Sequence, residues 1–215
     1  MTQKAYKGIA MEGVLATWYA KNTGNSAAFH DDAARIARRL APGSTVLEVA
    51  PGPGFLSIEL ARLRYRVHAI DISRSFVRIT SENASRAAVA VEVRHGNASN
   101  LPYAADTFDF IVCRAAFKNF SDPTGALREM HRVLRPGGTA LLIDMRSDAT
   151  DDGIADETTK LNLGAWSGLI TRVTLRSLRR RAYSKRDIEE MVAPIAFARV
   201  DIVEDSIGFE ASLTK

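Results

Sequence analysis

Residues 45–145 alternate between short apolar runs and segments with helical periodicity, and this alternation restricts the fold more than any other feature. The apolar runs have the length and composition of strands: TVLEVA (45–50), RVHAIDIS (66–73), FDFIVC (108–113) and TALLIDM (139–145). Strands that alternate with helices pair in parallel through right-handed crossovers. The sequence therefore predicts an α/β fold, with helices on both faces of a mostly parallel sheet.

The remaining segments refine this architecture. Residues 89–95 (VAVEVRH) place Glu92 and Arg94 at alternate positions, which predicts an exposed edge strand. Residues 198–205 and 209–213 flank a Ser-Ile-Gly turn and predict a closing antiparallel hairpin. Two helices are expected before the first strand, at about 9–21 and 27–40. The first of them is amphipathic, because apolar residues recur at helical spacing: Met11, Val14, Leu15 and Trp18.

Length and composition indicate one globular domain. The 215 residues are 46% hydrophobic and 25% charged, with a net charge of +4, as in ordinary soluble proteins. Cys113 is the only cysteine, which excludes an intramolecular disulfide and a thiolate zinc cluster. No signal-peptide pattern and no long apolar stretch is present, so we expect a cytoplasmic protein without a transmembrane segment.

The segment VLEVAPGPG (46–54) joins the first strand to a helix and predicts a ligand-binding turn. Glycines at 52 and 54 let the backbone approach a ligand closely, because no side chain intervenes. Asp71 ends the next strand, 71 − 52 = 19 residues after Gly52, where a carboxylate can accept from ribose hydroxyls. A nucleoside-bearing cofactor is the first hypothesis, and a plain tight connection is the alternative.

Three features favour S-adenosylmethionine over NAD as that cofactor. Ser57 stands in place of the third glycine of a dinucleotide fingerprint. Pro51 and Pro53 lack the N–H donors that a pyrophosphate needs. Glu48 would repel a diphosphate but would attract the ammonium group of a methionine moiety.

Four segments together resemble the class I S-adenosylmethionine-dependent methyltransferases, of the type 11 kind. These segments are VLEVAPGPG, AIDIS (69–73), GNASNLPYAADTFDFIVCRAAFKNF (96–120) and LREMHRVLRPGGTALLID (127–144). The resemblance implies a Rossmann-like, seven-stranded, mostly parallel sheet with a C-terminal antiparallel hairpin. It also implies S-adenosyl-L-methionine as cofactor and S-adenosyl-L-homocysteine as product.

The resemblance further implies roles for individual residues. Glu48, Gly52 and Gly54 would face the methionine part of the cofactor. Asp71 would hold the ribose hydroxyls, and Ile72 would pack on the adenine.

Three more cofactor contacts are implied after the third and fourth strands. Asn97 and Ala98 would meet the adenine amino group and a ring nitrogen, and Arg114 would lie beneath the cofactor. Two residues depart from the family pattern. Ala50 replaces a glycine and fits the turn if its φ is negative, and Asn97 replaces an acid whose accepting role its carbonyl can keep.

The acceptor side is less defined. Lys118 and Asn119 resemble the Arg-Asn pair of the menaquinone/ubiquinone C-methyltransferase branch. As an alternative, Asn119 and Ser121 cap the following helix. Tyr19 either closes over the cofactor, as tyrosines do in related enzymes, or packs beside Trp18. No catalytic residue is identified, and structural or surface roles are expected for all four histidines: His30, His68, His95 and His131.

Two runs of charge follow the last parallel strand. The acidic run, 144–157, does not fit a calcium loop, because Thr159 stands where that loop needs Glu, and no metal site is predicted. The basic run, 172–186, has three interpretations: a solvated helix over the pocket, a site for an anionic or membrane-borne substrate, or an RNA contact. No RNA-methylation motif or RNA-binding domain supports the third, so nucleic acid is disfavoured.

We therefore predict a methyltransferase that acts on a small molecule, of lipophilic, aromatic or anionic character, by in-line displacement. An NAD-dependent oxidoreductase and a non-catalytic S-adenosylmethionine-binding protein are the alternatives. The predicted single domain spans 1–215 and has four regions: a helical cap (1–40), a cofactor-binding core (41–146), a substrate-side insertion (147–197) and the hairpin (198–215). The sequence leaves the oligomeric state and the methylated atom open.

Overall fold

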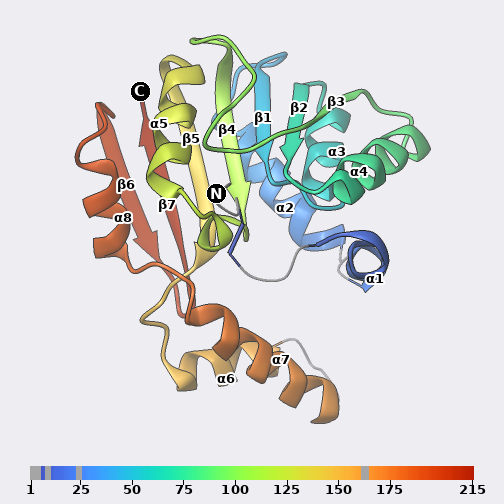
Figure 1. Cartoon of the computed structure of the whole chain (residues 1–215), viewed down its shortest axis with the longest axis vertical. Coiled ribbons are helices and arrows are strands. Elements are labelled where there is room, and N and C mark those ends of the chain that lie inside the picture. Colours follow the sequence, from blue (N-terminus) through green and yellow to red (C-terminus); the bar gives the residue numbers. More distant parts are fainter. Residues whose placement is uncertain (1–5, 8–10, 23–25, 161–164) are drawn as a thin grey trace, which may run out of the picture.

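Seven strands form one sheet in the order β3-β2-β1-β4-β5-β7-β6 (Figure 1). The computed structural model describes residues 6–7, 11–22, 26–160 and 165–215. The strands are β1 (Thr45–Val49), β2 (Arg66–Asp71), β3 (Val91–His95), β4 (Phe108–Arg114), β5 (Leu134–Met145), β6 (Arg199–Glu204) and β7 (Gly208–Thr214). Strands β1 to β5 pair in parallel, and β7 pairs antiparallel with both β5 and β6. The predicted mostly parallel sheet with a closing hairpin is confirmed.

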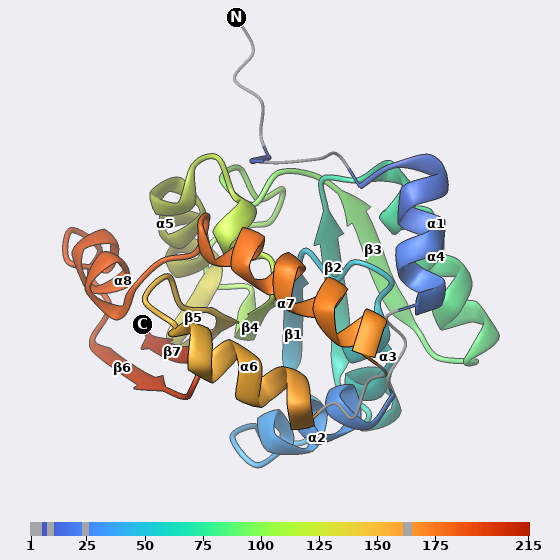
Figure 2. The ribbon, with the colours of Figure 1, turned by 90° about the horizontal axis from the view of Figure 1, so that it is seen from below.

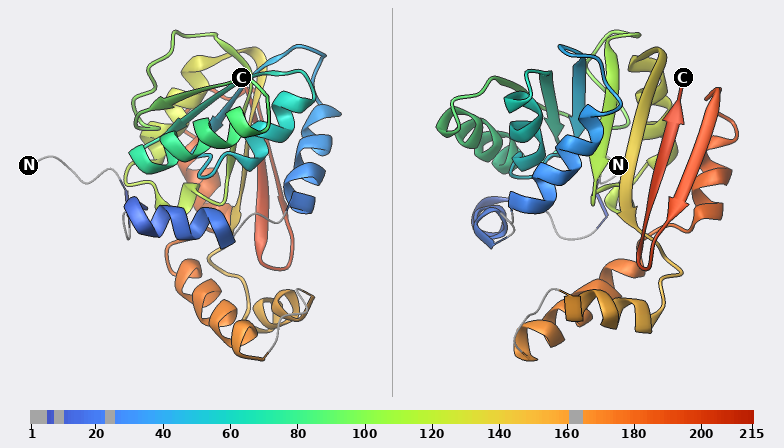
Figure 3. Two further views of the ribbon diagram at one scale, coloured as in Figure 1. Left: turned by 90° about the vertical axis from the view of Figure 1, so that its right-hand side faces the viewer. Right: turned by 180° about the vertical axis from the view of Figure 1, so that it is seen from behind.

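Helices cover both faces of this sheet (Figures 1 and 3). They are α1 (Gly13–Asn22), α2 (Ser26–Ala37), α3 (Phe55–Arg62), α4 (Arg74–Arg86), α5 (Pro123–Val133), α6 (Asp151–Lys160), α7 (Ala165–Arg179) and α8 (Lys185–Val192), with a 3₁₀ turn η1 (Phe117–Asn119). Helices α2 and α3 share one apolar cluster with the sheet, and α5 and α8 share another. Seen from below, α6 and α7 lie in front of the carboxyl ends of the strands, and α1 lies to one side, next to α4 (Figure 2).

Strand burial follows from position in the sheet. Every residue of β1, in the centre, is buried, as its continuous apolar run predicts. Strand β3 lies at the edge, where Glu92 and Arg94 are exposed and form an ion pair. The edge-strand prediction is confirmed.

Helix α1 turns its apolar stripe away from the protein. Val14 and Trp18 are exposed, while Ala16 packs against Phe76 and Ile79 of α4. The amphipathic pattern thus predicts the helix correctly, but Ala16 and Tyr19 contact α4, whereas Val14 and Trp18 face outward.

The turn from β1 into α3 needs three residues with positive φ. Gly52 and Gly54 have φ values of 56° and 79°, which glycine adopts without steric cost. Ala50 has a φ of 58°, so the expectation of a negative φ at this position is wrong. The methyl group of Ala50 is therefore held in a conformation that costs an L-residue about 1–2 kcal/mol.

Replacing Ala50 with glycine should relieve this cost. We expect Ala50→Gly to raise the free energy of unfolding by about 0.5–1 kcal/mol, after the greater chain entropy of glycine is subtracted. Ala87→Gly is the control, because Ala87 has a φ of −81° and gains nothing from glycine. Urea unfolding measures both variants, and equal destabilisation by the two would contradict the prediction.

Candidate active site

The carboxyl ends of β1 and β2 bring two acidic side chains to the same edge of the sheet. Glu48 lies in β1 and Asp71 ends β2, and both are buried. The two strands are neighbours and parallel, so the residues that follow them emerge side by side. The turn 50–54 starts from the same place, as predicted.

Glu48 is a buried carboxyl group with one close hydroxyl donor. Ser57, in the first turn of α3, donates a hydrogen bond to its Oε2. Burial, with a smaller contribution from the charge of Asp71, raises the pKa of Glu48 to about 7 against the lowering effects of Ser57 and Arg114. A cation arriving beside Glu48 would favour the ionised form. In the sequence, Ser57 is notable only because it replaces the third glycine of a dinucleotide fingerprint. In the structure, it is the hydrogen-bond partner of Glu48.

Asp71 holds the glycine turn as well as its own strand end. Its Oδ2 accepts from the N–H of Gly52 at 3.2 Å, and its Oδ1 accepts from the N–H of Ser73 at 2.8 Å. Burial raises the pKa of Asp71 to about 6, against the lowering effect of these two bonds. A carboxylate with two oxygens at this point can accept from two vicinal hydroxyls.

Helix α4 supports the turn from behind. Thr80 donates to the carbonyl of Gly52 at 2.7 Å, and Asn83 donates to that of Pro53 at 2.8 Å. A Cβ atom on Gly54 would lie 2.4 Å from the Thr80 methyl group, so only glycine fits there. A Cβ atom on Gly52 would meet nothing within 4 Å, which leaves that glycine open to a ligand.

The predicted adenine-side residues lie beyond β2 and β3. Ile72 is 37% exposed, and an aliphatic side chain in that state offers a surface for a flat ring. Asn97 Oδ1 already accepts from the N–H and the hydroxyl of Ser99, at 3.1 and 3.0 Å. An adenine amino group would have to replace the Ser99 hydroxyl at this oxygen. Ala98 packs against the core and holds the loop in place.

Arg114 ends β4 and is anchored to α2. Its Nε donates to Asp32 at 2.6 Å, and its guanidinium lies 4.7 Å from the centre of the Phe29 ring. The ion pair and the ring together fix the side chain at the sheet edge.

Lys118 belongs to a buried ion pair. Its Nζ lies 2.6 Å from Asp144 Oδ1 and donates to the carbonyl of Ala115 at 2.7 Å, and both charged side chains are at least 95% buried. Its backbone N–H also donates to Asp144 at 3.0 Å. These contacts join the segment after β4 to the end of β5.

The capping alternative for Asn119 and Ser121 is wrong. Asp122 is the N-cap of α5, and its side chain accepts from the N–H of Gly125 at 2.9 Å. Asn119 is 8% exposed, and its Oδ1 has no hydrogen-bond partner among the residues that the structure describes. A buried carbonyl in that state is available to a donor on a ligand.

Tyr6 is a residue of this edge that the sequence gives no sign of. It forms an isolated antiparallel bridge with Phe120, and the charges of Asp71 and Asp144 affect its pKa. Burial raises that pKa, so the phenol stays protonated and can donate a hydrogen bond. The charge of an ionised Tyr19 would also raise the Tyr6 pKa.

Tyr19 makes a packing contact, as its alternative interpretation predicts, but its partner is Phe76 and not Trp18. Its ring meets that of Phe76 edge-on at 5.9 Å, rather than packing beside Trp18 into a core. It is 36% exposed, so a ligand can also reach it.

The acidic and basic runs of the sequence meet in space. Asp151, at the start of α6, lies 3.3 Å from Arg176 and 2.9 Å from Arg179 of α7. In the described part of the chain, no group of three or more His, Cys, Asp or Glu side chains could hold a metal ion. Nor does any described helix have the length and apolar character needed to cross a bilayer.

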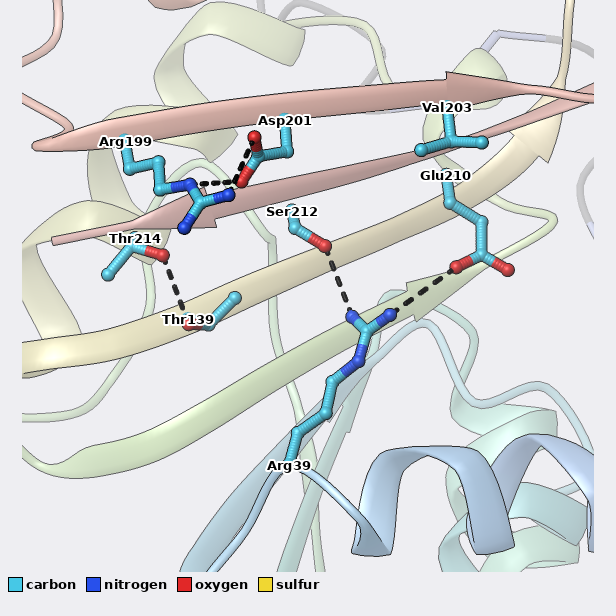
Figure 4. Close-up of a pocket in the computed structure, with 8 residues that line it drawn as sticks. All are labelled: Arg39, Thr139, Arg199, Asp201, Val203, Glu210, Ser212 and Thr214. Carbon is cyan, nitrogen blue, oxygen red and sulfur yellow. Dashed lines mark hydrogen bonds and ion pairs between the residues drawn. The ribbon is translucent and has the colours of Figure 1, made fainter.

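A hollow lies elsewhere, on the face of β5, β7 and β6 (Figure 4). Its charges are already paired: Arg199 with Asp201, and Arg39 with Glu210 and the hydroxyl of Ser212. Val203 is an exposed apolar residue beside them. The hollow contains none of the residues predicted to bind a cofactor.

Comparison with known proteins identifies the segment that carries the site. Residues 47–142 match the family model described as "Methyltransferase domain". Over these residues the chain is similar to that methyltransferase family, as the sequence motifs predict. The candidate site residues from Glu48 to Asn119 lie inside the match.

Relatives and solved structures agree with this assignment. The ubiquinone/menaquinone biosynthesis C-methyltransferase of Klebsiella pneumoniae is 37% identical over 107 residues, which is 47% of this chain and 43% of that protein. The demethylmenaquinone methyltransferase of Deinococcus radiodurans is 34% identical over 107 residues, 49% of this chain and 44% of that protein. The matches thus span less than half the length of these relatives.

Among solved structures, a candidate S-adenosyl-L-methionine-dependent methyltransferase of Methanococcus maripaludis aligns with a TM-score of 0.77 and 21% identity. The alignment covers 100% of this chain and 97% of that one. A methyltransferase of Aquifex aeolicus aligns with a TM-score of 0.70 and 22% identity, over 92% and 97% of the two chains. At these identities the structures establish the fold of the whole chain.

Removing one partner of the buried ion pair should destabilise the fold strongly. We expect Lys118→Met to lower the free energy of unfolding by about 3–5 kcal/mol, because Asp144 would be left buried without its countercharge. Adding Asp144→Asn should restore a large part of this loss, because the amide keeps an acceptor without the charge. Lys185→Met is the control, since its contact with Glu189 at 3.9 Å is exposed and should contribute less than about 1 kcal/mol. Chemical unfolding that gives similar losses for both single variants would contradict this prediction.

The raised pKa of Glu48 should appear in the pH dependence of stability. The folded state binds the Glu48 proton more tightly than the unfolded state, so this contribution to stability falls as pH rises through about 7. Glu48→Gln keeps an acceptor for Ser57 without a charge. We expect this variant to equal the wild type near pH 4, below the pKa of an unfolded Glu, and to exceed it by roughly 3 kcal/mol near pH 8. Urea unfolding across this range measures the difference, and parallel profiles for the two proteins would rule out the raised pKa.

Proposed function

We propose that the chain is an S-adenosyl-L-methionine-dependent methyltransferase that methylates a small molecule. The observation that carries this proposal is the pair of buried carboxyl groups, Glu48 and Asp71, beside an open glycine turn in a methyltransferase domain. The chemistry of these groups fits the cofactor. One carboxyl group can pair with the ammonium group of the cofactor, and the other can accept from its ribose hydroxyls. Because Gly52 has no side chain, the backbone of the turn can lie close to the cofactor.

Within this proposal, each cofactor-side residue has a defined task. Glu48 would ionise next to the ammonium group, and Asp71 would accept from the ribose hydroxyls while it holds the N–H of Gly52. Ile72 would cover the adenine ring, and Asn97 and Ala98 would border its polar edge. Arg114 would support the floor of the site from β4.

The sulfonium of the bound cofactor supplies a good leaving group, so methyl transfer is a direct displacement. The protein then has to align the acceptor and exclude water. Asn119 and Tyr6 are suited to orient an acceptor, because one offers a buried carbonyl and the other a protonated phenol. Lys118 would act as a positioning residue, through its ion pair with Asp144.

We propose that 1–215 acts as one domain, with the cofactor in 41–146 and the acceptor pocket built by 1–40 and 147–197. We propose a lipophilic or aromatic acceptor, because two relatives are by name a ubiquinone/menaquinone biosynthesis C-methyltransferase and a demethylmenaquinone methyltransferase. A reducing, cytoplasmic setting is proposed from the single cysteine, Cys113, which is a buried free thiol.

Calorimetry with S-adenosylhomocysteine and NADH tests the cofactor assignment. We expect Asp71→Ala to weaken S-adenosylhomocysteine binding by roughly 2–4 kcal/mol, because two ribose hydrogen bonds are lost at about 1–2 kcal/mol each. Asp109→Ala is the matched control, since Asp109 also accepts from a backbone N–H, at 2.7 Å from Thr45, but at the opposite end of the sheet. That control should bind with unchanged affinity. Binding of NADH in place of S-adenosylhomocysteine would reject the proposal in favour of an oxidoreductase.

Labelled cofactor supplied to a small-molecule extract tests the reaction itself. Transfer of label to a small molecule is expected, and it should be lost with Asp71→Ala. Cofactor binding without any transfer would favour the non-catalytic alternative.

A further inference from the structure

Two helices at the carboxyl edge of the sheet each expose an apolar stripe. On α1 the stripe contains Val14 and Trp18, which are 87% and 60% exposed. On α7 it contains Leu169, Ile170 and Val173, which are 54%, 64% and 58% exposed. We call these five residues the edge stripes. Side chains of this size are normally buried, so their exposure on two separate helices requires an explanation.

The edge stripes are not the faces that attach these helices to the protein. Helix α1 contacts α4 through Ala16 and Ala20, on its opposite side. Helix α7 packs through Leu175 and Leu178 against a cluster that includes Ile154 of α6. Each helix therefore has two apolar faces, of which the second is left uncovered. Seen from below, α7 crosses in front of the strand ends where the candidate active site is located, and α1 lies to one side of them, next to α4 (Figure 2).

The charges beside the edge stripes are basic. Neither helix contains an acidic residue, and an exposed cation accompanies each stripe: Lys21 on α1, and Arg180 directly after α7. The nearest acidic helix, α6, lies on the packed side of α7, where Asp151 is paired with Arg176 and Arg179. The exposed side thus combines aliphatic residues, a tryptophan and cations.

We propose that the edge stripes are a docking surface for an anionic lipid bilayer. Aliphatic side chains enter the boundary between head groups and acyl chains, tryptophan favours the interface, and lysine and arginine meet anionic head groups. A protein partner would not require cations beside both stripes. This inference goes beyond the proposed function and does not depend on it, although docking would place the carboxyl edge of the sheet at the membrane.

Vesicle sedimentation with the full chain tests the proposal. Vesicles of phosphatidylcholine and phosphatidylglycerol should bind the protein, and pure phosphatidylcholine should bind it less. We expect Leu169→Ser combined with Val173→Ser to lower the partition coefficient by roughly tenfold, since two apolar side chains would no longer enter the bilayer. Val203→Ser is the matched control, because Val203 is 69% exposed on the outer strand β6 and belongs to neither α1 nor α7. It should leave the partition coefficient unchanged.

Two further measurements separate the alternatives. In Trp166→Phe, Trp18 is the only tryptophan of the chain, and its emission should shift to the blue with vesicles. Arg180→Glu should weaken binding to anionic vesicles, whereas Arg128→Glu, on the exposed side of α5, should not. All variants should bind S-adenosylhomocysteine like the wild type, which also shows that they fold.

Three results would overturn the proposal. One is wild-type protein that does not sediment with anionic vesicles. Another is equal loss of binding in the edge-stripe variant and in Val203→Ser. The third is a dimer that the edge-stripe variant dissociates, without vesicle binding, which would show that a second copy covers the stripes. Because S-adenosylhomocysteine binding is measured separately, failure of docking does not affect the proposed function.

Discussion

The candidate site depends on two buried carboxyl groups, those of Glu48 and Asp71. They lie at the ends of adjacent parallel strands, and neither has a buried basic partner of its own among the described residues. Placing Glu48 and Asp71 in a low-dielectric region is unfavourable for their ionised forms, and their raised pKa values express this. The chain offsets part of the cost with neutral donors: the Ser57 hydroxyl and the N–H groups of Gly52 and Ser73. Neutral donors fix the geometry but leave the charge uncompensated. A cationic ligand supplies the missing charge, which connects this cost to binding.

At the carboxyl ends of β4 and β5, by contrast, the buried charges compensate each other. Lys118 and Asp144 neutralise each other directly after β4 and at the end of β5, and the backbone N–H groups of Lys118 and Met145 complete the contacts of the carboxylate. The carboxyl edge is thus divided into an acidic half at β1 and β2 and a neutral half at β4 and β5. A ligand with one cationic end and one apolar end would be oriented by this division alone.

Sequence patterns predict the parts of the structure that depend on local order. The alternation of apolar runs and helices predicts the sheet, the hairpin and the edge position of β3, and the spacing from Gly52 to Asp71 brings both to one edge. Features that depend on contacts between distant segments are not predicted. The positive φ of Ala50 follows from the path between β1 and α3, and the outward stripe of α1 follows from how closely α4 approaches. Tyr6 lies in a segment without periodicity, and its place beside Phe120 arises only when the chain folds back.

The contact between Gly54 and Thr80 has a consequence for how sequences of this fold can change. Thr80 fills the space that a side chain at 54 would need, and its hydroxyl holds the carbonyl of Gly52. A larger residue at 80 would push the turn away from α4, and a smaller one would release it. These two positions, far apart along the chain, therefore constrain one another. Substitutions in α4 can thus move the turn, and with it the site, while every residue of the turn stays the same.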